Sequence, residues 1–229
     1  IPGIIGGVGP ESTVDYYRSI ISLYRERYDP HGYPELLIAS IDMTRMLSMI
    51  EANDMGSLVD LLVGTFSRLR SAGADFGAIA SNTPHVVFDE LRKAVPMPLI
   101  SIVESTTERA ASAGITRAAL LGTAFTMNND FYQTSFERRG ISLLVPSPDE
   151  REYIHLRIFD ELEFGLVKPD TRKGFDAIIG RMREEHGIEG VVLGCTELPL
   201  LYPEPEGPGG IPLFNTARIH IEEIIAAMG

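Results

Sequence analysis

Short apolar runs alternate with longer amphipathic segments along the whole chain. In the first half, the runs at residues 3–7, 35–41, 76–80 and 99–103 are typical of buried strands. Residues 55–70 predict a helix whose inward face carries Leu58, Leu61, Leu62, Phe66 and Leu69. Because strands that alternate with helices form parallel sheets, the pattern predicts an α/β fold.

The first strand is followed by a glycine-rich turn and then by a helix. Pro10 stands at the first helical position, which proline favours. Apolar residues then recur at helical spacing at Val14, Tyr17, Ile20, Ile21 and Tyr24.

The second half repeats this order. Strands are predicted at residues 118–121, 141–145, 190–194 and 211–214, and helices at 84–94, 128–138, 149–164 and 170–186 complete the two halves. Asn215 is a candidate cap for a last helix that reaches residue 228. The halves look like copies of one unit offset by about 115 residues, because Gly7 falls near Gly122, Asp15 on Asp130, Tyr17 on Tyr132 and Ser81 beside Cys195.

Composition narrows the class of protein. With 229 residues and 44% hydrophobic content, the chain is long enough for one large or two small domains. The net charge of −12 argues against nucleic acid and anionic membranes as partners. No run is long enough to span a membrane and no basic-apolar leader precedes the first strand, so a cytoplasmic location is expected.

Metal and disulfide chemistry are not indicated. The single cysteine excludes an internal disulfide and a thiolate-rich metal site. The five histidines show no metal-binding spacing, and no cofactor motif is complete. The glycine turn at residues 6–9 lacks the lysine of a phosphate loop and the third glycine of a dinucleotide fingerprint. Gly7 is therefore a candidate for substrate contact, and an ordinary tight turn fits equally well.

Two strand ends carry matching polar residues. Thr83 and Pro84 predict a helix start directly after Ser81 and Asn82, and free N–H groups at such a start favour an anion. Thr196 follows Cys195 in the same way in the second half. One helix start alone would be ordinary capping, but two in equivalent places favour a carboxylate site.

Cys195 is the candidate with the most chemistry. Lone cysteines usually pack as small hydrophobic side chains. Cys195, however, stands where a strand meets a helix start, which lowers a thiol pKa and favours a thiolate base. Glu197 could tune the thiol, orient a substrate amine, or only complement the helix dipole. Ser81 cannot rest as an alkoxide, so it could donate a proton, relay one through water, or merely bind substrate.

The remaining candidates are weaker. Thr123 and Thr126 follow the first strand of the second half and could contact a ligand or only satisfy the turn. Arg45 follows the second strand and is a candidate partner for a side-chain carboxylate.

Four motifs carry a resemblance over essentially the whole chain. They are Gly-Gly-x-Gly-Pro-Glu-Ser-Thr at 6–13, Asn-Thr-x-His at 82–85, Gly-Thr-x-x-Thr-Met-x-x-Asp-Phe-Tyr at 122–132 and Gly-Cys-Thr-Glu at 194–197. In these residues the chain resembles the aspartate/glutamate racemase family. The resemblance implies cofactor-independent chemistry, two pseudo-symmetric α/β lobes with the active site in the cleft between them, and a homodimer. By analogy, the first lobe is residues 1–99 plus 208–229 and the second is 100–207.

The resemblance also assigns roles. Cys195 corresponds to the thiol base, and Asn82, Thr83 and Thr196 correspond to carboxylate binders. Family members typically use two cysteines, and Ser81 departs from that pattern, as in the branch that has a hydroxyl residue and favours one enantiomer.

The leading hypothesis is an amino-acid racemase that acts on aspartate, glutamate or a similar acid. A one-cysteine decarboxylase or cis–trans isomerase of dicarboxylates is the enzymatic alternative, and a catalytically reduced amino-acid-binding relative is the third.

Overall fold

The protein folds as two compact units, described one at a time below. A computed structural model describes residues 1–229, apart from the side chain of Pro10. The first unit comprises Ile1–Ile102 and His220–Gly229, and the second comprises Val103–Ile219. In the described part of the chain, no helix is both long and apolar enough to cross a membrane.

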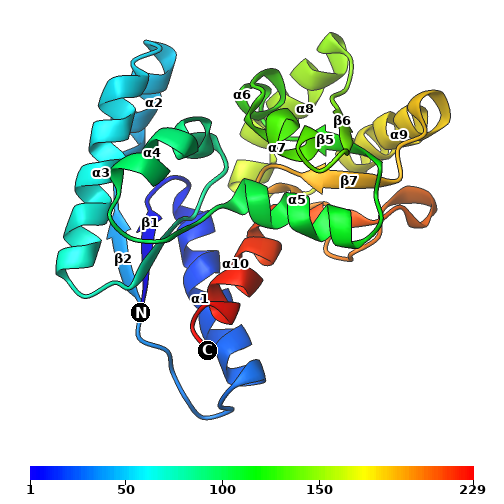
Figure 1. The fold of residues 1–229 in the computed structure, drawn as a ribbon. Coiled ribbons are helices and arrows are strands. Elements are labelled where there is room, and N and C mark those ends of the chain that lie inside the picture. Colours follow the sequence, from blue (N-terminus) through cyan, green and yellow to red (C-terminus); the bar gives the residue numbers. More distant parts are fainter. The chain divides into compact units, whose positions relative to one another are not determined.

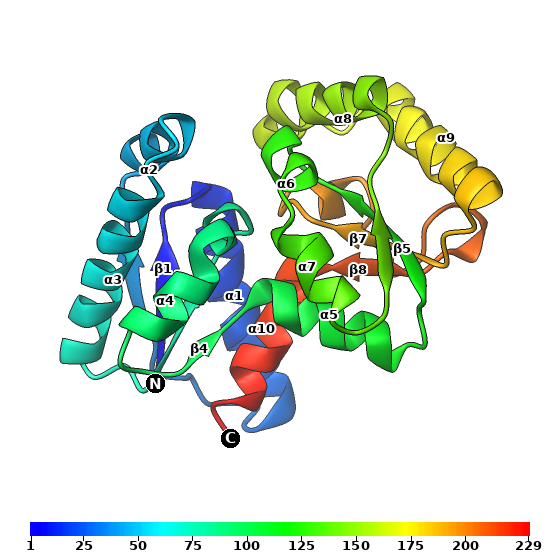
Figure 2. The same cartoon turned by 45° about the horizontal axis from the view of Figure 1, so that its top comes forward.

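The first unit is a parallel four-stranded sheet with helices on both faces (Figures 1 and 2). Its strands stand in the order β2-β1-β3-β4, with α1 on one side and α2 and α3 on the other. Its elements are β1 (Pro2–Gly6), α1 (Pro10–Arg27), β2 (Leu37–Ser40), α2 (Met43–Glu51), α3 (Met55–Ser71), β3 (Phe76–Ile79), the 3₁₀ helix η1 (Thr83–Val87), α4 (Phe88–Ala94) and β4 (Leu99–Ile100).

The second unit repeats this arrangement with the order β6-β5-β7-β8, again all parallel. In Figure 2, α8 and α9 lie on one side of this sheet and α5 and α7 on the other. Its elements are α5 (Ile102–Ser112), β5 (Arg117–Leu121), α6 (Ala124–Asn128), α7 (Phe131–Glu137), β6 (Ser142–Leu144), α8 (Pro148–Asp160), η2 (Leu162–Phe164), α9 (Pro169–His186), β7 (Gly190–Leu193), η3 (Leu198–Leu200), η4 (Pro208–Gly210), β8 (Leu213–Asn215) and α10 (Thr216–Ala226), of which α5 begins and α10 ends in the first unit.

The predicted α/β class and the duplication are confirmed by the two identical strand orders. The predicted division at residue 208 is not observed, because β8 completes the second sheet by pairing with β7, with Leu213 opposite Val191. The first sheet already has its fourth strand in β4. Only residues 220–229 return to the first unit, which is discontinuous as expected.

The central strands are buried along their full length, which explains their continuous apolar character. Every residue of β1, β3 and β7 is buried. Helices cover both faces of each sheet, so these strands have no solvent side and need no polar alternation.

Three α-helices were not predicted from the sequence, and one of them is the five-residue α6, which ends where the predicted helix at 128–138 begins. Residues 43–51 form α2, and residues 102–112 form α5, so the run at 99–103 is a two-residue strand followed by a helix start. Asp42 caps α2 by accepting a hydrogen bond from the Arg45 backbone N–H at 3.1 Å. Elsewhere the predicted cap Asn215 is confirmed, since its side chain accepts from Arg218 N at 3.0 Å.

The buried face of α1 differs from the predicted spacing. Tyr16, Ile20 and Leu23 are buried, whereas Val14 and Tyr17 are 41% and 48% exposed. Apolar residues therefore run along two sides of this helix, and only one side enters the core. The sequence repeat places Tyr17 on Tyr132, but Tyr132 is fully buried and the fully buried tyrosine of α1 is Tyr16.

Gly7 occupies a backbone conformation that only glycine adopts easily. Its φ is 81°, and a Cβ atom there would lie 2.5 Å from the backbone oxygen of Ile41. We expect Gly7→Ala to lower the free energy of unfolding by at least about 2 kcal/mol. Gly64 in α3 is the matched control, because a Cβ there meets nothing within 4 Å. Gly64→Ala should raise stability by about 0.5–1 kcal/mol in the same urea titration. A Gly7→Ala variant as stable as wild type would contradict the turn geometry.

Candidate functional site

In each unit the candidate residues stand where the strand order reverses direction. In the first sheet, β2 lies on one side of β1 and β3 lies on the other, so the connections after β1 and after β2 run in opposite directions. In the second sheet, β6 and β7 flank β5 in the same way. Ligands of open parallel sheets bind outside the carboxyl ends of the strands at such a point. Ser81 follows β3 and Cys195 follows β7, so both stand at the switch point of their own sheet.

In the first unit, the turn after β1 is tied to the start of α1 and to the end of β3. The Thr13 hydroxyl accepts from Gly7 N at 2.9 Å and donates to Gly9 O at 3.2 Å. The Ser12 hydroxyl donates to Ala80 O at 2.9 Å. These bonds place the glycine turn beside the buried Ser81.

The helix start after Ser81 is a 3₁₀ turn shifted by one residue from the prediction. Asn82 stands at the cap position of η1 without a side-chain capping bond, and Thr83 is already its first residue. The expected capping role of Thr83 is therefore wrong. Within the described residues, the Thr83 N–H and hydroxyl make no hydrogen bond. They remain available to an anion at the carboxyl edge of β3.

A buried histidine pair lies beneath this turn, which the sequence did not predict. His85 Nε2 accepts from Ile102 N at 3.3 Å, and burial lowers the pKa of His85 to about 3. His220 accepts from the Tyr16 hydroxyl at Nδ1 (2.8 Å) and donates from Nε2 to Ile100 O (3.0 Å). Burial lowers the pKa of His220 to about 4. Both imidazoles are neutral at physiological pH.

In the second unit, Cys195 lies between the strand end and a polar pair. Its side chain is 8% exposed, and Sγ donates to Glu197 Oε2 at 2.9 Å. The Thr196 hydroxyl donates to both carboxylate oxygens of Glu197 at 2.9 Å. The Glu197 carboxylate thus accepts hydrogen bonds from both Cys195 and Thr196, just after the end of β7.

The thiol does not have the lowered pKa expected from the sequence. Burial raises the pKa of Cys195 well above its ordinary value, and the negative charge and the hydrogen bond of Glu197 raise it further. No long helix opposes these effects, because the segment after Cys195 is the three-residue 3₁₀ helix η3. A single short turn has little of the dipole that stabilises a thiolate at a helix start. Cys195 is therefore a neutral thiol in the free protein.

Glu163 is a further candidate site residue that the sequence analysis missed. Burial and the charge of Glu197 raise the pKa of Glu163, and the charge of Glu163 in turn raises the pKa of Cys195. Glu163 belongs to η2, which is separated in the chain from β7 by the whole of α9. Only the fold brings this second carboxylate to the thiol.

The segment that carries Glu163 is anchored by the buried carboxylate of Glu161. The Thr171 hydroxyl donates to it, Arg157 lies at 2.7 Å and Lys168 at 3.2 Å. These contacts, the bond from Thr171 first, lower the pKa of Glu161 in spite of its burial. Leu166 N also donates to Glu161 O at 2.9 Å, which closes the turn around Glu163.

Thr126 fills the space between the two strand ends of the second unit. A Cβ atom on Gly122 or Gly194 would lie 3.2 Å from a Thr126 side-chain carbon, so small residues are needed at both strand ends. Thr123 caps α6 by accepting from Thr126 N at 3.3 Å. Thr126 is fully buried and packs against Gly194, the residue before Cys195. Thr123 is half-buried.

Arg45 lies in α2, after the carboxyl end of β2, and is exposed. Within the described residues, its guanidinium forms no ion pair. The structure thus groups Gly7, Ser81, Asn82 and Thr83 in the first unit, with Arg45 one strand away. Cys195, Thr196, Glu197 and Thr126 form the group in the second unit.

Comparison with known proteins identifies the family. The sequence profile of the Asp/Glu/Hydantoin racemase family matches residues 5–224. The chain belongs to the Asp/Glu/hydantoin racemase family. It is accordingly an isomerase of the amino-acid racemase type.

Individual relatives are similar to this chain over most of its length. An aspartate racemase homologue from Pyrococcus horikoshii is 38% identical, with a TM-score of 0.87 over 99% of this chain and 97% of the other. The broad specificity amino-acid racemase RacX of Bacillus subtilis is 27% identical over 205 residues, or 86% of this chain and 85% of RacX. The Picrophilus torridus aspartate racemase, at 22% identity and a TM-score of 0.72 over 98% of this chain and 92% of the other, shares the fold.

The thiol of Cys195 lies next to Glu197 and is influenced by the charge of Glu163. Among the described residues, no group of three or more histidine, cysteine, aspartate or glutamate side chains could hold a metal ion. Neutralising the charges of Glu197 and Glu163 would lower the pKa of the Cys195 thiol and favour its thiolate, although the larger effect of burial would remain. A bound cation at Glu197 and Glu163 would have this effect.

Burial raises the pKa of the Cys195 thiol most and the Glu197 carboxylate raises it further, so removing the carboxylate should reverse part of the shift. We expect Glu197→Gln to lower the pKa of Cys195, because the negative charge disappears. The thiolate should then form at lower pH, and alkylation by iodoacetamide at neutral pH should become several-fold faster. Glu163→Gln should act in the same direction but less, and Asp160→Asn serves as the matched control. An unchanged pH profile in Glu197→Gln would contradict this electrostatic account.

Proposed function

We propose that the protein is a cofactor-independent amino-acid racemase that acts on aspartate, glutamate or a similar amino acid. The observation that carries the proposal is the position of Cys195. Its thiol stands at the switch point of the second sheet and is bonded to Glu197, in a chain of the racemase family. The relatives that are named racemases support the reaction type, and RacX in particular supports a broad substrate range.

The proposed reaction begins with charge neutralisation. The substrate ammonium binds at Glu197 and Glu163, whose negative charges raise the pKa of the thiol in the free protein. With these charges balanced, Cys195 loses its proton to solvent and becomes a thiolate. The thiolate then takes the Cα proton, and the electron pair moves into the substrate carboxylate to give an enediolate-like dianion.

The dianion requires donors that are in place before it forms. We assign this role to the N–H and hydroxyl of Thr83, to Asn82, and to the backbone N–H of Thr196, whose hydroxyl is already directed to Glu197. Gly7 and Thr123 are proposed to border the substrate, with Thr126 behind them. Arg45 is the proposed partner of a side-chain carboxylate.

The second proton transfer is assigned to the face served by Ser81. A proton returns to Cα through the Ser81 hydroxyl, directly or through a water molecule, and the configuration is inverted. A serine hydroxyl is a far weaker base than a thiolate, so kcat of the reverse direction should be lower, while kcat/KM is the same in both directions because the equilibrium constant between enantiomers is one. The proposed racemase is therefore kinetically biased toward one enantiomer.

The proposal is tested by proton NMR in D₂O. The L and D forms of aspartate and glutamate are incubated with the protein first, followed by the other common amino acids. A racemase replaces the Cα proton signal with deuterium and forms the opposite enantiomer. Release of CO₂ from substituted malonates, without exchange in any amino acid, would instead indicate the decarboxylase. Binding without either reaction would indicate the catalytically reduced relative.

A further inference from the structure

The two carboxylates that act on Cys195 are carried by short segments. Glu163 belongs to η2, and Glu197 stands directly before η3. A 3₁₀ helix of three residues has little stability of its own, because its hydrogen bonds are few and poorly aligned. The positions of both carboxylates therefore depend on the contacts that anchor these segments to the rest of the second unit.

Thr171, in the first turn of α9, anchors η2. Its hydroxyl donates to the carboxylate of Glu161, and the two side chains are only 3% and 2% exposed. The backbone oxygen of Glu161 accepts from Phe164 N at 3.1 Å and from Leu166 N at 2.9 Å, on either side of the bend after Glu163. Because a hydroxyl bond to a carboxylate is charge-assisted, it is stronger than a neutral one. Thr171 thus fixes the place of Glu163 through Glu161.

Arg172, the next residue of α9, anchors the end of η3. Its guanidinium donates to the backbone oxygen of Leu201 and pairs with Asp176 at 3.1 Å. Its Cζ also lies 4.1 Å from the centre of the Tyr202 ring, and the Tyr202 hydroxyl donates to Asp176 at 2.8 Å. Leu201 and Tyr202 close the segment that begins at Glu197. Arg172 thus binds this segment at the end opposite to the carboxylate.

Consecutive residues of one helix therefore anchor both segments. Adjacent side chains point about 100° apart around a helix axis, so one turn can contact a different segment on each side. Burial and then the charge of Glu197 raise the pKa of Glu163, which places the two carboxylates within electrostatic reach of each other. Two negative charges that are held close together favour a cation between them.

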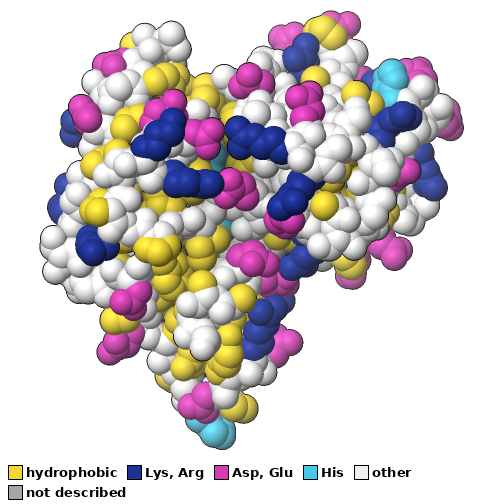
Figure 3. All heavy atoms as spheres, in the orientation of Figure 1, with side chains coloured by type: hydrophobic (Ala, Val, Ile, Leu, Met, Phe, Trp, Pro, Cys, Tyr) yellow, Lys and Arg dark blue, Asp and Glu magenta, His cyan; other side chains and the backbone are white. Residues whose placement is uncertain are grey.

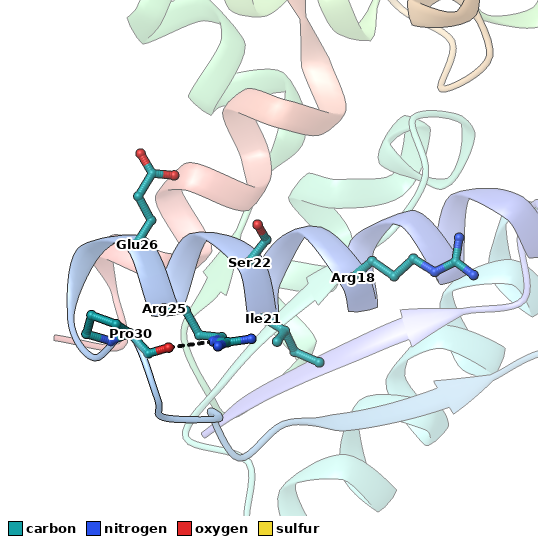
Figure 4. A pocket seen from close by; sticks show the side chains of 6 residues that line it. All are labelled: Arg18, Ile21, Ser22, Arg25, Glu26 and Pro30. Carbon is teal, nitrogen blue, oxygen red and sulfur yellow. Dashed lines mark hydrogen bonds between the residues drawn. The ribbon is translucent and has the colours of Figure 1, made fainter.

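The surface features of the molecule are separate from these contacts. On the face that Figure 3 shows, acidic and basic side chains are intermixed, and no single patch of one charge covers it. The shallow groove of about 470 Å³ in Figure 4 belongs to the first unit and is lined by Arg18, Ile21, Ser22, Arg25, Glu26 and Pro30. Its described lining includes none of the candidate site residues.

We propose that Thr171 and Arg172 are positioning residues, which together hold Glu163 and Glu197 at the separation that lets both contact one ammonium group. The proposal rests on the proposed function for the identity of that group, the α-ammonium of the amino-acid substrate. An ammonium between two fixed carboxylates is oriented as well as bound, so the adjacent Cα–H can be directed at the thiol. Neither Thr171 nor Arg172 touches the substrate itself.

Alkylation of Cys195 tests this arrangement without any substrate. We expect Thr171→Val to lower the pKa of Cys195 in the same direction as Glu163→Gln, because Glu163 is no longer held near the thiol. Alkylation by iodoacetamide at neutral pH should become about twofold faster, and the rate is followed as a function of pH. Thr171→Ser keeps the hydroxyl and is the matched control, which should behave like wild type.

A double variant distinguishes positioning from a general loosening of the structure. In the Glu163→Gln background, Thr171→Val should change the pH profile no further, because the charge that Thr171 positions is already absent. An equal acceleration in both backgrounds would show only easier access to the sulfur and would overturn the proposal. An unchanged profile in Thr171→Val would overturn it as well.

Arg172→Lys is a second variant, and it keeps the positive charge. A lysine ammonium cannot contact Leu201 O, Asp176 and the Tyr202 ring together, so the pH profile should shift in the same direction as in Thr171→Val. Arg183→Lys is the matched control, because Arg183 donates to Gly209 O at 2.9 Å toward the other end of α9. It should leave the profile unchanged. Thermal unfolding shows whether each variant is folded.

Racemisation kinetics connect the anchors to the substrate. Thr171→Val and Arg172→Lys should raise KM for aspartate or glutamate several-fold and change kcat less, because they disturb the binding of the ammonium group. Shifted alkylation profiles in a protein that turns over no amino acid would support the anchoring role and show the proposed function to be wrong. Racemisation by wild type with unshifted profiles in both variants would support the proposed function and overturn the anchoring role.

Discussion

Replacing Cys195 with alanine is expected to reduce racemisation by about 10³-fold or more. The thiol is the proposed base, and alanine offers no group that can take a Cα proton. Cys195→Ser should be almost as inactive, because a hydroxyl is not ionised at neutral pH and is a much weaker base. Racemisation is measured by chiral chromatography of aspartate and glutamate, starting from each enantiomer.

The effect must be chemical and not structural. Alanine removes one buried sulfur, so the free energy of unfolding should fall by no more than about 1–2 kcal/mol. Thermal unfolding of both variants provides this check. If either folded variant keeps more than a small fraction of the wild-type rate, Cys195 is only a packed side chain, and the proposed mechanism is wrong.

Replacing Ser81 with cysteine is expected to accelerate the slower of the two directions, by about tenfold or more. In the proposed mechanism, the enantiomer whose Cα–H faces the Cys195 thiol reacts with the higher kcat. Its mirror image requires a base on the Ser81 face, where only a hydroxyl is present. A second thiol supplies that base, so the two initial rates should approach each other.

The equilibrium between enantiomers sets a limit on this experiment. Its constant is one by symmetry, so Ser81→Cys can change only kinetic parameters. Ser81→Ala is the matched control and should slow both directions, because no group is left to deliver a proton to that face. The value of kcat/KM must be equal for the two enantiomers in every variant, so the bias is measured as the ratio of the two kcat values at saturating substrate. An unchanged ratio of these kcat values in Ser81→Cys would show that Ser81 only packs against the strand end.

The repeated pattern of apolar runs was sufficient to predict most strands and the duplication. Strands such as β3 and β7 are buried on both sides and therefore appear as continuous apolar runs. The assignment of β8 was wrong, because which of two sheets a strand joins depends on pairing with distant partners. The helix predicted from the apolar residues of α1 is confirmed, but their spacing does not show which side is buried, since Val14 and Tyr17 are exposed and Tyr16 is buried.

The candidate residues were found from the sequence, but their electrostatics were not. A strand end followed by threonine suggests a helix start, and a helix start suggests a lowered thiol pKa. The segment after Cys195 is instead a short 3₁₀ turn, and burial with Glu197 and Glu163 raises that pKa. Glu163 could not be predicted, because no spacing in the sequence links η2 to β7. Its role depends on the tertiary fold alone.

The position of deuterium after a brief reaction in D₂O tests the central claim most directly. L-aspartate, D-aspartate and both enantiomers of glutamate are each incubated with wild type. The enantiomers are then separated, and the deuterium content of each is determined by mass spectrometry. Proton removal by Cys195 and return from the Ser81 face predict that each newly formed enantiomer carries one Cα deuterium. Newly formed enantiomer that keeps its Cα hydrogen, or a folded protein that neither exchanges nor inverts any of these acids, would contradict the account.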